Sequence, residues 1–201
     1  MRGHFGGKII EAFKVICLGG SAGGLEPYLD ILRCIPPTTG MAFVIAQHRG
    51  PSHPEMLPRL LATSTRMPVV DVEQGMRLEP DHVYVMPPRV DMTLENMTFR
   101  LRETQWPSGW PKTINVFLYS LAQEVHQHAI AVILSGLDGD GSAALHAVKA
   151  EGGITFAQSD AKFASMPQTA IETGHIDYML PALDIAKALI ELGHRTVRQD
   201  S

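Results

Sequence analysis

The chain has 201 residues, of which 45% are hydrophobic and 19% are charged, and its formal net charge is −4. This balance excludes wholesale disorder, and the length suits one sizeable hydrophobic core. The charge gives no basic footprint for nucleic acid, and no apolar run approaches the roughly 20 residues of a membrane-spanning helix.

Short apolar runs alternate with helical patterns along the first 80 residues. These patterns predict strands at 14–18, 42–46 and 69–72, and helices at 25–33 and 54–61. The stretch 80–103 breaks the alternation. Its three short runs predict a small antiparallel meander or flap on the edge of the sheet.

The alternation resumes in the second half of the chain. Helices are predicted at 114–126, 142–150, 167–173 and 183–192, and strands at 129–134, 154–157 and 176–179. Nearly continuous apolar strands separated by helices indicate a sheet that is covered on both faces. We therefore predict a single-domain α/β fold, doubly wound, with a mainly parallel sheet and an antiparallel hairpin at the edge.

The predicted domain occupies residues 13–193, between a flexible leader at 1–12 and a tail at 194–201. Its two cysteines, Cys17 and Cys34, are predicted to be buried thiols and not a disulfide. The first residues lack the charged-then-apolar pattern of an export signal. Both observations favour a cytoplasmic location.

Residues 19–24 (GGSAGG) form a glycine-rich turn between a predicted strand and a predicted helix. Glycines on either side of Ser21 allow a sharp turn that presents its hydroxyl at a helix N-terminus, as a nucleophile requires. The same kind of turn also binds phosphate in doubly wound folds, with the serine as a helix N-cap. The motif alone leaves both interpretations open.

Two further motifs follow predicted strands, so they reach the same edge of the sheet. His48 comes directly after the second strand, and residues 135–141 (SGLDGDG) follow the strand at 129–134. A histidine and a carboxylate there, Asp138 or Asp140, would complete a Ser-His-Asp arrangement. Alternatively, an Asp caps the helix that begins near Ser142, or the acids and the His bind a metal, although no dense ligand set is present.

These motifs, in the order Ser, His, Asp, resemble the catalytic domain of the CheB protein-glutamate methylesterase family. The stretches 75–78, 80–88, 157–158 and 166–171 agree with that resemblance, which covers residues 13–193. The region 82–101 is most similar to the version that is fused to a chemoreceptor methyltransferase. The resemblance implies no metal and no organic cofactor.

The resemblance assigns a role to each motif residue. Ser21 becomes the nucleophile, His48 the base and Asp140 its carboxylate partner. The backbone N–H groups of Ala22 and Leu137 become the oxyanion donors. Two positions depart from the family pattern, because Ala22 stands where Thr is common and Leu137-Asp138 where Met-Gly is common.

The implied activity is hydrolysis of glutamyl methyl esters on a chemoreceptor or related signalling protein, with release of methanol, and also glutamine deamidation. The implied partners are that methylated protein and a methyltransferase or regulatory protein, without nucleic acid or membrane insertion. Only about a dozen residues precede the first predicted strand, too few for a receiver domain, so we expect activity without a phosphodonor.

Two rival functions remain. Ala22 and Asp138 motivate a non-catalytic signalling or binding module that keeps the fold. The glycine-rich turn motivates a nucleotide-binding domain, but His48-Arg49 stand where an acidic ribose partner is expected after the second strand.

Overall fold

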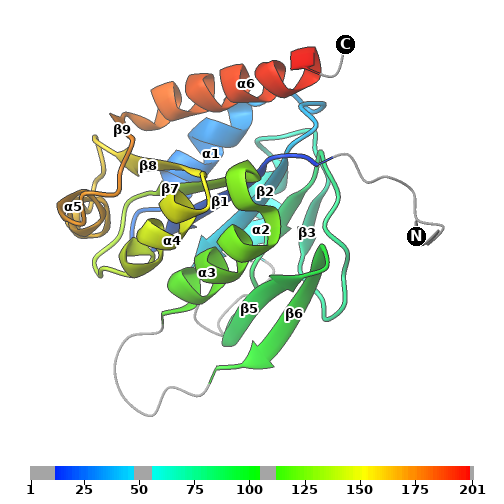
Figure 1. Cartoon of the computed structure of the whole chain (residues 1–201), viewed down its shortest axis with the longest axis horizontal. Helices are drawn as coiled ribbons and strands as arrows, with labels where there is room; N and C mark the ends of the chain where they lie inside the picture. Colours follow the sequence, from blue (N-terminus) through cyan, green and yellow to red (C-terminus); the bar gives the residue numbers. More distant parts are fainter. Residues whose placement is uncertain (1–11, 48–55, 105–111, 200–201) are drawn as a thin grey trace, which may run out of the picture.

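The computed structural model describes residues 12–47, 56–104 and 112–199, with side chains described as far as residue 193 (Figure 1). At its centre is a sheet of seven parallel strands in the order β3-β4-β2-β1-β7-β8-β9. The strands are β1 (Val15–Gly20), β2 (Ala42–Gln47), β3 (Val69–Asp71), β4 (Val83–Val85), β7 (Ala129–Ile133), β8 (Ile154–Gln158) and β9 (Tyr178–Leu180).

Helices cover both faces of this sheet, so its central strands are buried on both sides. One face packs against α1 (Leu25–Cys34), α2 (Met56–Ala62) and α6 (Ala182–Gln199). The other packs against α3 (Thr113–Val125), α4 (Leu145–Ala150) and α5 (Ser165–Glu172). Figure 1 shows α1 and α6 on one side and α3 on the other. This double cover explains why β1 and β7 are uninterrupted apolar runs in the sequence.

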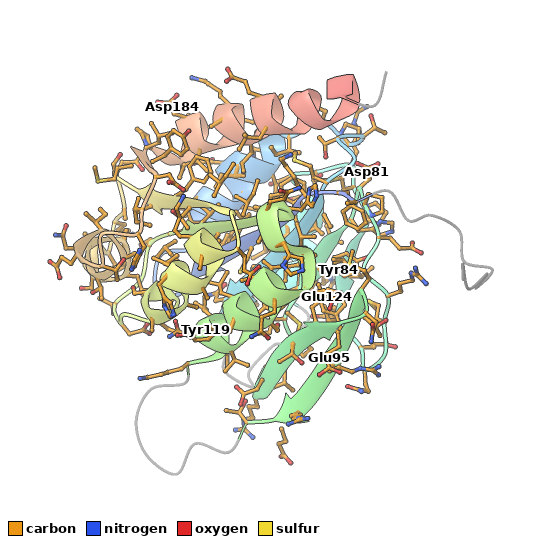
Figure 2. The ribbon with its side chains drawn as sticks, viewed as in Figure 1. Asp81, Tyr84, Glu95, Tyr119, Glu124 and Asp184 are labelled. Atoms are coloured by element: carbon orange, nitrogen blue, oxygen red, sulfur yellow. The ribbon has the colours of Figure 1, made fainter. Side chains whose placement is uncertain are left out.

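A separate two-stranded antiparallel sheet consists of β5 (Val90–Glu95) and β6 (Thr98–Glu103). It packs on α3, where Glu124 accepts a hydrogen bond from the Met97 N–H at 2.8 Å and Ser120 accepts one from the Leu94 N–H at 3.0 Å. Figure 2 shows Glu124 beside this hairpin. The α/β fold with a mainly parallel sheet and an antiparallel hairpin is thereby confirmed.

Within the stretch 80–103, one detail of the prediction is wrong. The run that becomes β4 does not join a meander, because β4 lies between β2 and β3 in the main sheet and pairs with both in parallel. Its three residues are fully buried. A strand this short carries no periodicity that distinguishes an interior parallel strand from a hairpin strand.

Two local expectations also differ from the structure. Cys17 is buried as predicted, but Cys34, the last residue of α1, is exposed. The closing helix α6 continues to Gln199, across the boundary predicted at residue 193. Most of the predicted leader lies outside the described residues. No helix within the described ranges is both long and apolar enough to cross a membrane.

The strand order reverses beside β1. From β1 the chain adds β2 on one side, whereas the later strands β7, β8 and β9 extend the sheet on the other. At the carboxyl ends of these strands, Gly20 is aligned with Gln47, and Gly19 with Ile133. Ligands of open parallel sheets bind beyond the carboxyl ends of the strands at such a reversal, and the motifs that follow β1 and β7 lie at that position.

Candidate active site

Ser21 lies one residue beyond the end of β1 and is half-buried. Its backbone N–H donates to the Ser135 carbonyl at 2.9 Å, and its own carbonyl accepts from the Gly24 N–H at 3.1 Å. Gly23 has a φ of 71°, a conformation that favours glycine. Helix α1 begins only after Gly24, its N-cap residue, so Ser21 is not the N-cap that the alternative interpretation required.

The turn around Ser21 rests on the buried side chain of Tyr28. A Cβ atom at Gly20 would lie 2.5 Å from the Tyr28 hydroxyl oxygen, so this position has no room for a side chain. Burial raises the pKa of Tyr28 well above its usual range, and its hydroxyl has no hydrogen-bond partner within the described residues. The sequence pattern identified Tyr28 only as an apolar helix position and missed this contact.

Ser135 ties together the loops that follow three strands. It is fully buried, and its hydroxyl donates to the Ala22 carbonyl at 2.9 Å and accepts from the Phe163 N–H at 3.0 Å. Its backbone N–H donates to the Gln158 side-chain carbonyl at 3.1 Å. Together with the bond from the Ser21 N–H, these contacts fix the loop after β7 beside the loop after β1. The sequence analysis missed this bridging role.

Asp140 is buried, with 5% of its surface exposed, and its carboxylate accepts hydrogen bonds from four N–H groups of the described residues. Oδ2 accepts from the Ile114 N–H at 2.8 Å. Oδ1 accepts from the Asn115 N–H at 3.0 Å, the Asn115 side-chain amide at 2.8 Å and the Gly141 N–H at 2.9 Å. The carboxylate therefore lies at the N-terminus of α3, where unpaired N–H groups and the helix dipole stabilise a negative charge.

The predicted alternative, in which an aspartate caps the helix near Ser142, is therefore wrong for Asp140. The short helix η2 (Ser142–Ala144) begins after Gly141, without a side-chain cap. Asp140 instead caps α3, which begins 27 residues earlier in the sequence. Asp138, half-buried, accepts a hydrogen bond from the Asp140 N–H at 2.8 Å.

The two predicted oxyanion donors lie in the loops after β1 and β7, Ala22 in the first and Leu137 in the second. Within the described residues, the backbone N–H groups of Ala22 and Leu137 donate no hydrogen bond. The Leu137 side chain is 60% exposed, in contrast to the buried Gly136 beside it. A Cβ atom at Gly136 would collide with Met166 of α5, so glycine is required for this loop to approach α5 so closely.

His48 lies outside the described residues, and the structure gives no geometry for it. The strand that leads to it ends at Gln47, which is aligned with Gly20 at the end of β1. The described part of the chain contains no group of three His, Cys, Asp or Glu side chains that could hold a metal ion. The Cys17 thiol of β1 lies close enough to Asp140 for the two groups to interact electrostatically. Burial, together with the charge of Asp140, raises the pKa of the Cys17 thiol far above its usual range.

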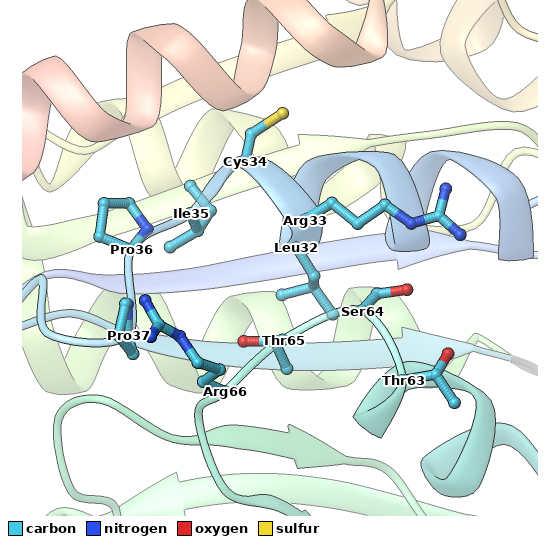
Figure 3. A pocket seen from close by; sticks show the side chains of 10 residues that line it. All are labelled: Leu32, Arg33, Cys34, Ile35, Pro36, Pro37, Thr63, Ser64, Thr65 and Arg66. Carbon is cyan, nitrogen blue, oxygen red and sulfur yellow. The ribbon is translucent and has the colours of Figure 1, made fainter.

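A cavity of about 460 Å³ lies away from these loops, at the C-terminus of α1 and the start of the connection from α2 to β3 (Figure 3). Because α1 runs back from the end of β1, this cavity is at the edge of the sheet where the strands begin. Its polar lining consists of Arg33, Arg66 and the hydroxyls of residues 63–65. None of the predicted site residues lines it.

Comparisons with known proteins give one family. The family model described as CheB methylesterase matches residues 16–189. A Burkholderia pseudomallei protein named protein-glutamate methylesterase/protein-glutamine glutaminase 1 is 30% identical over 188 residues, 90% of this chain and 51% of that protein. A Leptospira interrogans protein that carries these two activity names provisionally is 31% identical over 191 residues, 93% of this chain and 98% of that protein.

Comparison with solved structures points to the same family. The crystal structure of the Thermotoga maritima CheB methylesterase catalytic domain matches with a TM-score of 0.82 and 29% identity, over 90% of this chain and 98% of that one. This chain spans about half the length of the first curated relatives it matches. Because the family model matches most of the chain and the architecture agrees, this chain belongs to the CheB methylesterase family.

Proposed function

We propose that this domain hydrolyses glutamyl methyl esters on a methylated chemoreceptor or related signalling protein and releases methanol. The observation that carries the proposal is the hydrogen bond from the Ser21 N–H to the Ser135 carbonyl. It joins the loop of the nucleophile to the loop of Asp140 at the strand-order reversal, where an α/β sheet binds its ligands. The names of the curated relatives support the reaction.

In the first half of the reaction, the Ser21 hydroxyl oxygen attacks the ester carbonyl carbon while His48 takes its proton. Asp140 accepts a hydrogen bond from the imidazole and stabilises its positive charge. The backbone N–H groups of Ala22 and Leu137 donate to the oxyanion. The C–O bond to the methoxy group then breaks, the imidazolium returns the proton to it, and methanol leaves.

In the second half, water attacks the acyl-enzyme with His48 again as base. The bond to the Ser21 oxygen breaks, this oxygen recovers its proton from the imidazolium, and a glutamate carboxylate remains on the substrate. The same steps with a glutamine side chain would release ammonia in place of methanol. Deamidation is therefore the second activity that we propose, and the relatives' double name favours it.

Asp138 motivated the non-catalytic rival, because its charge lies in the same loop as a proposed oxyanion donor. One of its carboxylate oxygens accepts the Asp140 N–H at 2.8 Å, which directs that oxygen toward the backbone of the loop. This bond gives Asp138 a role in shaping the turn. A structural role for the Asp138 side chain supports our proposal that the loop keeps its active geometry although Asp138 adds a negative charge.

The experiment is methanol release from a methylated receptor fragment by the purified domain, with ammonia release measured on a fragment that carries glutamine. A fluorophosphonate probe should label Ser21 in the folded wild-type protein and should not label the Ser21→Ala variant. Absence of both methanol release and labelling in folded protein would favour the non-catalytic module. The free thiols of Cys17 and Cys34 suit the cytoplasmic location of such a substrate.

A further inference from the structure

We propose that Leu137 and Phe163 form an apolar rim beside Ser21, and that this rim binds an apolar side chain of the substrate protein next to its esterified glutamate. This inference rests on the proposed function and adds what the substrate must offer beside the ester. The Leu137 side chain is 60% exposed, although the preceding residue, Gly136, is buried. In the proposed reaction Leu137 acts only through its backbone N–H, so its side chain has no assigned role.

The loop that carries Leu137 is anchored on both sides of this residue. The Gly136 N–H donates to the Phe163 carbonyl at 2.9 Å, and the Gly136 carbonyl accepts from the Met166 N–H at 3.1 Å. On the other side, the Asp138 carboxylate accepts the Asp140 N–H at 2.8 Å. The exposed side chain therefore projects from a fixed backbone. A partner that covers it does not have to order the loop first, which favours binding.

Phe163 extends this apolar surface to the turn of the proposed nucleophile. A Cβ atom at Gly23 would lie 2.8 Å from Cδ2 of the Phe163 ring, so the ring packs directly on the turn two residues after Ser21. The Phe163 N–H donates to the Ser135 hydroxyl at 3.0 Å, which fixes the ring beside the loop after β7. Phe163 is half-buried, so part of its surface remains accessible.

The length of a glutamyl side chain determines how near the substrate backbone must come. Its carbonyl carbon lies three bonds of about 1.5 Å from its Cα atom and must approach the Ser21 oxygen to about 3–3.5 Å, so the substrate backbone passes within about 8 Å of that oxygen. Leu137 is two residues, at most about 7 Å of chain, from Ser135, whose carbonyl accepts the Ser21 N–H at 2.9 Å. The residues that flank the ester therefore come within reach of the rim.

The chemistry of the rim selects the kind of residue that it binds. The side chains of Leu137 and Phe163 have no hydrogen-bonding group, so a contact with them gains free energy only when apolar area is removed from water. If the modified glutamate lies on a helix, its neighbours on the same face are three or four positions away. We therefore expect an apolar side chain at one of these distances from the ester.

The experiment compares two methyl esters, with methanol release measured for wild type and Leu137→Ser. One ester is a methylated receptor fragment, and the other is the γ-methyl ester of N-acetylglutamate, which has no flanking residues. The ratio of kcat/KM for the fragment to kcat/KM for the small ester should fall about tenfold in Leu137→Ser, through a higher KM for the fragment. Any disturbance of the Leu137 N–H affects both esters and cancels in this ratio. Leu137→Met, which remains apolar, should restore the ratio to within about twofold of wild type.

Leu183→Ser is the matched control. Leu183 lies in the first turn of α6, is 51% exposed and follows β9, which is three strands from β1 in the sheet. The same chemical change there should leave both rates and their ratio unchanged. An equal fall of the ratio in Leu183→Ser would overturn the inference, because the effect would then not depend on the rim.

A second test changes the substrate. In a fragment whose apolar residues within four positions of the glutamate are replaced by serine, Leu137→Ser should raise KM no further than about twofold, because the contact has already been removed. Independent, additive effects of the two changes would contradict a direct contact. If Leu137→Ser instead dissociates a wild-type dimer in size-exclusion chromatography and leaves the ratio unchanged, the rim is an interface between copies of the chain, and the inference is wrong.

Because Leu137 is exposed, Leu137→Ser should keep its Tm within about 2 °C of wild type. If that variant does not fold, Leu137→Gln keeps the length of the side chain and gives the same test. The wild-type protein separates the two proposals. If it releases methanol from neither ester, the proposed function fails. If it hydrolyses both esters and folded Leu137→Ser has the wild-type ratio, only the apolar rim fails.

Discussion

The two edges of the main sheet differ in where their polar groups lie. At the edge where the strands end, Asp140, Asn115 and Ser135 are buried and hydrogen-bonded to backbone groups of neighbouring loops. At the opposite edge, the cavity in Figure 3 is lined by Arg33 and Arg66, which are exposed. Burying a carboxylate requires compensating donors, whereas an exposed arginine requires none. Buried and hydrogen-bonded polar groups therefore distinguish the side of the sheet where we propose the active site, whereas the cavity of Figure 3 lies on the other side.

The polar groups at the cavity make short-range contacts instead: the Thr63 hydroxyl donates to the Leu60 carbonyl at 2.6 Å, and the Met67 N–H donates to the Thr65 hydroxyl at 3.1 Å. Arg33 pairs with Asp30 at 3.2 Å on the surface, an interaction typically worth about 0–1 kcal/mol. The Ser64 hydroxyl is buried, with the residue 8% exposed, and it has no hydrogen-bond partner within the described residues. Each side of the sheet therefore has a serine to replace, Ser21 at the strand ends and Ser64 at the cavity. Only the first replacement should affect turnover.

The largest difference is expected between Ser21→Ala and Ser64→Ala. Loss of a nucleophile in a Ser-His-Asp site costs up to about 10⁶-fold in kcat, so methanol release by Ser21→Ala should become undetectable while the protein stays folded. Ser64→Ala should leave turnover unchanged and the free energy of unfolding within about 1 kcal/mol, because an unpartnered hydroxyl is removed. Turnover and urea unfolding measure both. A Ser21→Ala protein that kept a tenth of the wild-type rate would remove Ser21 from its role.

The next comparison is between the two carboxylates of one loop. Asp140→Asn should lower kcat by about 10⁴-fold, as replacing the carboxylate of a serine-protease triad does, because an amide favours the wrong imidazole tautomer. Asp138→Asn should cost less than about tenfold, because an amide oxygen can still accept the Asp140 N–H. Rates should be measured below the Tm of each variant, since Asp140→Asn also weakens the contacts with α3. A larger loss in Asp138→Asn would reverse the assignment.

A third comparison concerns packing beneath the loop after β7. Gly136→Ala should destabilise the protein by about 1–3 kcal/mol, because its Cβ would meet Met166, which is fully buried. Gly139→Ala should cost less, since its Cβ would lie 3.0 Å from a methyl group of the exposed Thr169. Thermal unfolding of the two variants gives the difference. Equal Tm values would mean that the loop moves away from α5 without cost.

The smallest effect is expected far from the site, at Asp177. Partial burial alone would raise its pKa, but hydrogen bonds from Lys149 at 2.6 Å and from Thr155 lower it below its usual value. A lowered folded-state pKa stabilises the fold above the unfolded value of about 3.9, and this contribution is lost as pH falls through the folded pKa. Asp177→Asn should therefore cost about 1 kcal/mol at pH 7, and the difference from wild type should shrink under acid. A difference that does not depend on pH would contradict this origin.

Local patterns were enough to predict most elements and the order of the motifs. The sequence placed α3 within one residue of its ends and predicted β1, β2 and β7 as buried strands, because these depend on periodicity and apolar runs. It placed β4 in a meander because the partners of a three-residue strand are set by distant segments. The contacts of Asp140 with Ile114 and Asn115 were missed for the same reason, since no local signal links residues 25 or 26 positions apart. The catalytic roles of Ser21, His48 and Asp140 remain predictions.

The position of Asp140 at the start of α3 gives the carboxylate that we propose as catalytic a second, structural role. A descendant of this domain that lost its activity could discard Ser21 without harm to its fold. In the same descendant, loss of Asp140 would break the hydrogen bonds to Ile114, Asn115 and Gly141 and leave the N-terminus of α3 without its cap. In sequences of this kind, we expect the aspartate to be retained after the enzymatic activity has been lost. The presence of the aspartate therefore indicates an intact fold. The presence of the serine is the better indicator of whether a member of the family is catalytically active.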